Sequence, residues 1–132
     1  MANRYFRSQF WHTFLTKPVQ LFGQVAIGAV GAPTLSASLS KGIASISRVS
    51  AGLYTLTLSD KYNKAVGWSF GIFKASGAPS AASCVTPVVR ALSVSSATPT
   101  FQVEFVDAAG AAVELASGVT VYFSMTFDDS GV

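Results

Sequence analysis

The residue types that perform most enzyme chemistry are scarce in this chain of 132 residues. Histidine and cysteine each occur once, as His12 and Cys84, and no local spacing relates them. A Cys–His pair needs the thiol and the imidazole within hydrogen-bond reach, so the sequence does not support such a dyad. We interpret His12 as a packing or interface residue and Cys84 as a partly buried structural thiol. A single cysteine also excludes an intrachain disulfide.

The acidic residues do not form a recognisable metal or acid–base site. Asp128 and Asp129 are the only adjacent acidic pair, while Asp107 and Glu114 flank a predicted long loop. A calcium site takes roughly six to eight oxygen ligands, and glycoside hydrolysis needs two carboxylates across a substrate. The segment 28–31 lacks the glycine pattern and the following helix of a phosphate-binding loop. We therefore expect no enzymatic activity, no catalytic residue, no metal and no cofactor.

The chain has far fewer charges than a typical soluble domain. Hydrophobic residues make up 50% of it and charged residues only 11%, against about 25% charged residues in soluble domains generally. No apolar stretch is long enough for a transmembrane helix, so a membrane is not an expected partner. The composition predicts that part of the surface is buried against other chains, and we expect a homo-oligomer.

Alternation with a period of two residues is the main structural signal. It is clear over residues 53–58, 66–72, 101–107 and 119–127, and weaker over 19–27, 35–39, 43–49 and 85–94. Such alternation is typical of strands that bury one face. Short helical turns are predicted over 59–64 and 111–116. The sequence therefore predicts an all-β fold, an antiparallel β-sandwich or jelly-roll-like domain, as a single domain over residues 18–132.

Residues 1–17 differ from the rest, because they are dense in aromatic and basic side chains and lack strand alternation. We predict an N-terminal arm that docks on a neighbouring chain. The alternative is a short amphipathic helix capping the sandwich, since Phe6, Phe10 and Phe14 are spaced by four. The candidate assembly-interface residues are Arg4, Tyr5, Phe6, Arg7, Phe10, Trp11, Phe14 and Phe22.

The start of the arm also has some features of a nucleic-acid binder. Arg4 and Arg7 bracket Tyr5 and Phe6, and single-strand binders combine cations and aromatics in this way. The remainder of the chain adds no dense basic stripe. We therefore do not expect nucleic acid to be a partner.

Several short motifs resemble small virion proteins of tailed bacteriophages. They are the stretches 31–35, 40–48, 50–58, 106–110 and 116–118, the last predicted strand, and the opening Met-Ala-Asn-Arg. The resemblance implies a virion structural protein similar to capsid decoration or cement proteins, which bind the outside of the assembled shell, often as trimers. Its implied partners are itself, with a trimer favoured, and the major capsid protein or other virion proteins. It implies synthesis in the host cytoplasm, a place on the capsid surface, and no catalytic residues.

Two alternatives remain open at this point. The first is a tail or head–tail (neck) subunit, which the same resemblance allows. The second comes from another functional class, a glycan-binding β-sandwich displayed on the virion, in which Trp68, Tyr54 or Tyr122 would line an exposed groove. Alternation places Trp68 with Val66 and Phe70 on the predicted core face. Tyr122 lies on the polar face of its strand and is the better candidate.

Overall fold

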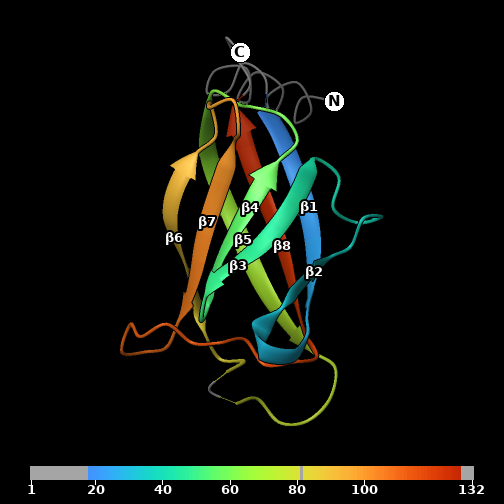
Figure 1. Cartoon of the computed structure of the whole chain (residues 1–132), viewed down its shortest axis with the longest axis vertical. Coiled ribbons are helices and arrows are strands. Elements are labelled where there is room, and N and C mark those ends of the chain that lie inside the picture. The colour runs from blue at the N-terminus through green and yellow to red at the C-terminus, as the bar shows by residue number, and fades with distance from the viewer. Residues whose placement is uncertain (1–17, 81, 129–132) are drawn as a thin grey trace, which may run out of the picture.

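The computed structural model describes residues 18–80 and 82–128 as two four-stranded sheets packed face to face (Figure 1). The strands are β1 (Pro18–Ile27), β2 (Pro33–Leu35), β3 (Ile43–Ser50), β4 (Leu53–Leu58), β5 (Lys64–Lys74), β6 (Thr86–Ser93), β7 (Thr100–Val106) and β8 (Val119–Asp128), with one 3-10 turn, η1 (Ala29–Gly31). Sheet I has the order β2-β1-β8-β5 and sheet II the order β3-β4-β7-β6. Every strand pairing is antiparallel, which confirms the predicted β-sandwich.

Helix is confined to the single turn η1 within the described ranges. None of these residues forms a helix with the length and hydropathy needed to cross a membrane.

Strand β8 shows most clearly why these residues form a sandwich. It lies between β1 and β5 in sheet I and pairs with both along nearly its whole length. Its alternate residues point into the core and are buried: Val119, Val121, Phe123, Met125 and Phe127. In sheet II, β7 follows the same rule, because Phe101, Val103 and Phe105 are buried while the residues between them are only half-buried. The two apolar faces meet and make the core.

An aromatic cluster joins the two sheets at the centre of the core. The ring of Phe70 on β5 lies 5.9 Å from that of Phe123, 6.0 Å from that of Phe101 and 6.4 Å from that of Phe105, measured between centroids. These separations lie within the range of favourable tilted and edge-to-face aromatic pairs. Phe70 therefore ties β5, an edge strand, to both layers of the sandwich.

Gly23 on β1 makes room for one of these rings. Gly23 and Phe123 are opposite each other in the β1–β8 ladder. A Cβ atom on Gly23 would lie 2.0 Å from Cζ of Phe123 and under 3 Å from both Cε atoms. The ring thus occupies the space that any other side chain at position 23 would need.

Both predicted helical turns are wrong. Residues 59–63 form an irregular connection with bends, and two of its backbone groups bond to distant segments: Tyr62 N–H donates to the Val94 carbonyl (2.8 Å) and Asn63 N–H to the Asp128 carbonyl (2.9 Å). At the second site, Asp107 N–H donates to the Ala111 carbonyl (2.9 Å), which starts a turn instead of a helix. Long-range hydrogen bonds therefore outweigh the weak local preference in the first segment. In the second, the Asp107 carboxylate accepts from Ala109 N–H and Ala111 N–H and stabilises the turn instead.

The predicted face of β5 needs one correction. The register of β5 against β8 shifts between Ala65 and Gly67, which is a β-bulge. Val66 lies in the bulge and is exposed, so it does not share the core face with Trp68 and Phe70. Trp68 faces inward and meets Phe101 edge-to-face at 5.6 Å, yet it remains 45% exposed at the open side of the sandwich.

Two smaller predictions also differ from the structure. The strand predicted over 35–39 comprises only Pro33–Leu35, because the chain turns where Leu39 N–H donates to the Ser36 carbonyl (3.2 Å). Cys84 is exposed, not partly buried, since it lies in the connection between β5 and β6.

The close contact at Gly23 yields a stability test. We expect Gly23→Ala to lower the free energy of unfolding by about 1–3 kcal/mol, because the added methyl group collides with the buried Phe123 ring. Gly67→Ala is the matched control on β5, where an added Cβ would meet nothing within 4 Å, and we expect it to be neutral or slightly stabilising. Urea unfolding of both variants measures the difference, and equal stabilities would contradict the packing described for Gly23.

Candidate functional site

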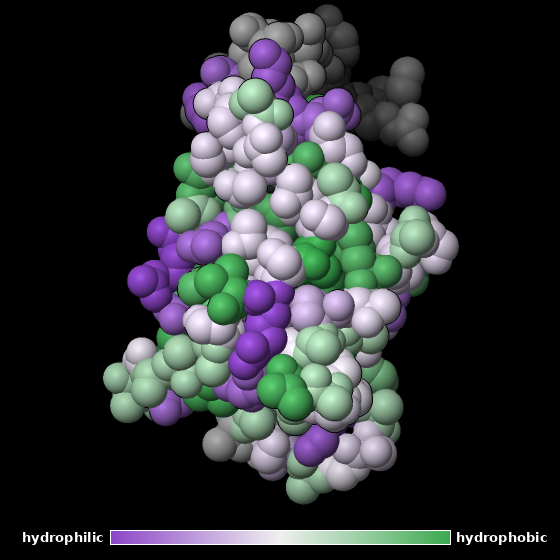
Figure 2. Space-filling model, viewed as in Figure 1, coloured by the Kyte–Doolittle hydropathy of each residue, from purple (hydrophilic) through white to green (hydrophobic). Residues whose placement is uncertain are grey.

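The outer faces of the two sheets differ in chemistry. On sheet II, Gln102 Nε2 donates to Thr55 Oγ1 (3.0 Å), and Arg90 pairs with Glu104. Figure 2 shows hydrophilic and intermediate residues interspersed with small hydrophobic patches over the visible face. On sheet I, by contrast, Phe22 and Tyr122 are 59% and 47% exposed. An asymmetric distribution of exposed aromatic residues points to sheet I as the candidate binding face.

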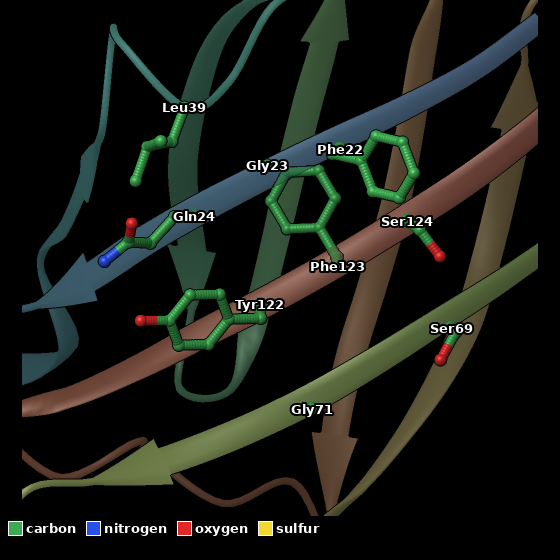
Figure 3. Close-up of a pocket in the computed structure, with 9 residues that line it drawn as sticks. All are labelled: Phe22, Gly23, Gln24, Leu39, Ser69, Gly71, Tyr122, Phe123 and Ser124. Atoms are coloured by element: carbon green, nitrogen blue, oxygen red, sulfur yellow. The ribbon is translucent and has the colours of Figure 1, made fainter.

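A shallow groove of about 470 Å³ runs over the outer side of sheet I (Figure 3). We call it the aromatic groove. It is lined by residues of β1, β5, β8 and the loop after β2, namely Phe22, Gly23, Gln24, Leu39, Ser69, Gly71, Tyr122, Phe123 and Ser124.

Strand register produces the shape of the aromatic groove. In one row across the sheet, Phe22 of β1 is opposite Ser124 of β8, which is opposite Ser69 of β5. In the next row, Tyr122 of β8 is opposite Gly71 of β5. Each aromatic side chain therefore has a small residue beside it. The small residues form the floor and the aromatic rings form the walls.

The loop over residues 36–42 supplies the rim of the groove and is tied to β1 at Gln24. Gln24 N–H donates to Ser40 Oγ (3.0 Å), and Ser36 N–H donates to the Gln24 carbonyl (2.9 Å). Ser40 is itself buried, so the loop is held against the strand and brings Leu39 to the groove. Figure 3 shows Leu39 across from Gln24 and Tyr122. The side-chain oxygen Oε1 of Gln24 is buried and accepts no hydrogen bond from the described residues.

The groove lining offers groups that bind by apolar contact and by hydrogen bonds. Its lining contains no carboxylate, imidazole, thiol or amine. It offers aromatic surface, two serine hydroxyls, the Tyr122 hydroxyl and one amide, which are groups that make apolar contacts and neutral hydrogen bonds. In the described part of the chain, no three His, Cys, Asp or Glu side chains lie together as metal ligands would.

A polar cluster of Arg48, Tyr54 and Glu114 lies outside the groove, where β3, β4 and the loop after β7 meet. Arg48 Nε donates to both carboxylate oxygens of Glu114, at 3.1 and 3.0 Å. The hydrogen bonds and charge of Arg48 lower the pKa of Glu114, although partial burial opposes this shift. Glu114 Oε1 also lies 3.4 Å from the hydroxyl of Tyr54.

Tyr54 makes this cluster a structural support. It is buried, and its hydroxyl donates to the Gly31 carbonyl (3.0 Å). Burial is the main reason that its pKa rises to about 12, and the neighbouring Glu114 charge raises it further. Tyr54 contacts Gly31 in the η1 turn and Glu114 in the 112–116 loop, so the cluster holds both segments against β4. We therefore assign it to stability, not to binding.

The sequence-predicted site residues fall into two groups. Phe22 lies in the aromatic groove, while Arg4, Tyr5, Phe6, Arg7, Phe10, Trp11 and Phe14 lie outside the described residues. Among the proposed groove aromatics, Tyr122 lines the groove, Tyr54 is buried and Trp68 covers the core edge.

Sequence reasoning missed the parts played by Gln24 and Leu39 in the groove. The alternation of β1 could have predicted that Phe22 and Gln24 point to the same outer face of the sheet. Leu39 carried no such signal, because its position depends on the long-range hydrogen bonds between its loop and β1.

Comparison with known proteins returned no match: no family model, no curated protein and no solved structure is similar to this chain. The chemistry and geometry of its own residues are therefore the basis for a functional proposal.

The raised pKa of Tyr54 predicts a specific loss of stability in alkali. Unfolded Tyr54 loses its proton near its ordinary pKa of 10.0, whereas the folded residue keeps it to about 12. The unfolded state is thus favoured as pH rises from 10 to 12. We expect the free energy of unfolding of Tyr54→Phe to fall less than that of the native chain over this interval.

The matched control for this measurement is Tyr122→Phe, because Tyr122 is exposed. It should follow the native chain. An alkaline fall of the same size in all three proteins would contradict the environment described for Tyr54.

Proposed function

We propose that the chain is a virion structural protein, a decoration or cement subunit that binds and stabilises the assembled head of a tailed phage. The observation that carries the proposal is the aromatic groove on sheet I, whose lining has no charged residue and exposes Phe22 and Tyr122. The resemblance of several sequence motifs to small phage virion proteins supports the same assignment.

The physical chemistry of the groove favours a protein partner. Aromatic residues are enriched and charged residues are depleted at the centres of protein interfaces. Phe22 and Leu39 are both more than half exposed, so contact with a partner would remove apolar surface from water at no cost in desolvated charge. Ser69, Ser124 and Gln24 supply hydrogen-bonding groups that would fix the orientation of that partner.

The N-terminal arm, residues 1–17, is the second proposed docking element. Its aromatic and arginine residues are of the types that dominate interface energetics, and we propose that it binds a neighbouring copy or the major capsid protein. Self-association, with a trimer favoured by the resemblance, would present several groove faces to the shell at once. Such multivalency raises avidity without a new kind of contact. The protein would be made in the host cytoplasm and placed on the capsid surface.

A shell-binding assay tests the groove directly. We expect Phe22→Ala and Tyr122→Ala each to weaken binding to shells assembled without this protein by about tenfold or more, because each removes an exposed aromatic anchor. Thr57→Ala on the outer face of sheet II is the matched control and should bind as the native chain does. Co-sedimentation measures binding, and thermal melting checks that each variant is folded. Native binding by both groove variants would remove the groove from the proposal.

The shell-binding assay also tests the arm, and electron microscopy tests where in the particle the protein lies. Replacing Phe10, Trp11 and Phe14 together with alanine should reduce binding if the arm docks on the shell or on a neighbouring copy. Electron microscopy of particles carrying the labelled protein separates the head from the alternative, a tail or neck site. A signal confined to the tail or neck would overturn the decoration role while keeping the structural one.

A glycan-binding role is the second candidate, and the groove favours it for a separate reason. Sugar rings present C–H faces that pack on aromatic rings, and their hydroxyl groups need nearby hydrogen-bond partners. Tyr122 and Phe22 offer the rings, and Ser69 and Ser124 the hydroxyls. Gln24 Oε1 is an acceptor without a partner among the described residues, which a sugar hydroxyl could satisfy if Leu39 moved aside.

A glycan array screen decides this candidate. If the groove binds sugar, the native chain gives defined hits, Tyr122→Ala loses them because the ring is gone, and Tyr122→Phe keeps most of the signal. The Thr57→Ala protein serves as the folded control. An array without hits for the native chain would retire the glycan role and leave the virion role untouched.

A further inference from the structure

Strand β5 presents an unprotected edge. It is the last strand of sheet I, and within residues 18–80 and 82–128 it pairs only with β8. Between Lys64 and Lys74 it contains no charged residue and no proline. A long, uncharged edge strand offers a row of backbone donors and acceptors to another strand, and natural sheets normally block such an edge.

The other three edges carry the usual protection. Strand β2 has three residues and begins with Pro33. Strand β3 carries Arg48 and two register shifts. Strand β6 carries Pro87 and Arg90 and has one register shift. Strand β5 has its single register shift near its start and is regular from Gly67 onward. Among the described residues, β5 therefore has the edge with the longest stretch free of features that oppose pairing.

If β5 pairs antiparallel with β5 of a second copy, the alternation of side chains limits the registers that are possible. Opposed residues must point to the same side of the sheet, so a two-fold axis has to pass through a residue. Centring the axis on Phe70 uses the whole regular stretch. Ser69 then faces Gly71, and Trp68 faces Ile72. Centring it on Ser69 instead would bring Ile72 opposite the bulge at Val66, so that only residues 67–71 would pair regularly.

On the outer side of the sheet, the Phe70-centred register matches large residues with empty space. It places Phe73, which is 54% exposed, opposite Gly67 of the second copy. An added Cβ on Gly67 would meet nothing within 4 Å, so the space above it is open to a ring. An aromatic side chain over a cross-strand glycine is a known stabilising arrangement in sheets. The match occurs twice, once on each side of the axis.

On the inner side, the same register covers apolar surface that one copy leaves in water. Trp68 packs on Phe101 but remains 45% exposed. In the paired strands it would meet Ile72 of the second copy, and the two Phe70 residues would be adjacent. Pairing of this kind would add cross-strand aromatic and aliphatic contacts to the backbone hydrogen bonds.

We propose that β5 pairs with β5 of a second copy about a two-fold axis at Phe70, joining two copies of sheet I into one continuous sheet of eight strands. The proposal deepens the self-association named above and rests on it only for its biological setting. A two-fold contact is distinct from a threefold one, so it would act alone or link two trimers.

Site-directed disulfides test the pairing and its register together. Directly opposed antiparallel residues have Cα atoms about 4.5–5.5 Å apart, which suits a disulfide. In a Cys84→Ser background, full-length Ser69→Cys and Gly71→Cys proteins are mixed and oxidised. We expect cross-linking between the two variants to exceed cross-linking within either one. Linkage of Ser69→Cys mainly to itself would place the axis at residue 69, linkage of Gly71→Cys mainly to itself would place it at residue 71, and either result overturns the register.

A charge on the edge tests the pairing without cysteine. We expect Ser69→Lys to raise the dissociation constant of the pair about tenfold or more, because two lysines would approach each other across the axis. Light scattering should show the particle mass halved at low concentration. Ser47→Lys on β3 is the matched control, an exposed serine on a protected edge, and it should leave the mass unchanged. An unchanged mass for Ser69→Lys would overturn the proposal.

Two further outcomes separate this inference from the proposed function. A native chain that stays monomeric, with β5 amides already protected from hydrogen exchange, would mean that the chain's own arm occupies the edge, and would overturn the pairing. Gly67→Lys changes β5 outside the groove lining and fills the space proposed for Phe73 of the second copy. A Gly67→Lys protein that is monomeric yet binds shells normally would support β5 pairing as a separate contact. Intact β5 pairs that do not bind shells would overturn the decoration role alone.

Discussion

The register of β8 between β1 and β5 is the constraint on which the rest of the structure depends. Because β8 pairs with both neighbours, one choice of register decides which of its side chains enter the core and which face outward. A slip by one residue would expose Phe123 and Met125 and bury Tyr122 and Ser124. The core and the aromatic groove are therefore two sides of one alternation, and neither can change without the other.

Small residues make room for aromatic rings on both sides of sheet I. On the inner side, Gly23 admits the Phe123 ring, which packs against Phe70, and Phe70 in turn meets Phe101 and Phe105 of sheet II. On the outer side, Gly71 and Ser69 leave the floor of the groove low beside Tyr122. A sheet with large residues at these positions would have a flat outer face and a strained core.

Most of the fold could be predicted from the sequence because its strands alternate strictly. The pattern of β4, β7 and β8 gave both the strands and their buried faces, and the polar-face position of Tyr122 followed directly. What could not be predicted depended on long-range contacts. The bulge that turns Val66 outward, the hydrogen bond of Tyr62 N–H to Val94, and the placement of Leu39 by Ser40 arise only when distant strands meet.

Two of the few ion pairs among the described residues lie at the edge strands of sheet II. Arg48 pairs with Glu114 beside β3, and Arg90 on β6 pairs with Glu104 on β7. Exposed ion pairs add little stability, but at these positions charge discourages pairing with another strand. The two edges of sheet II are thus blocked.

The groove and the middle of β5 have no charge at all. Exposed aromatic surface in the described residues is concentrated in this groove and along β5, which is why both proposals concern sheet I.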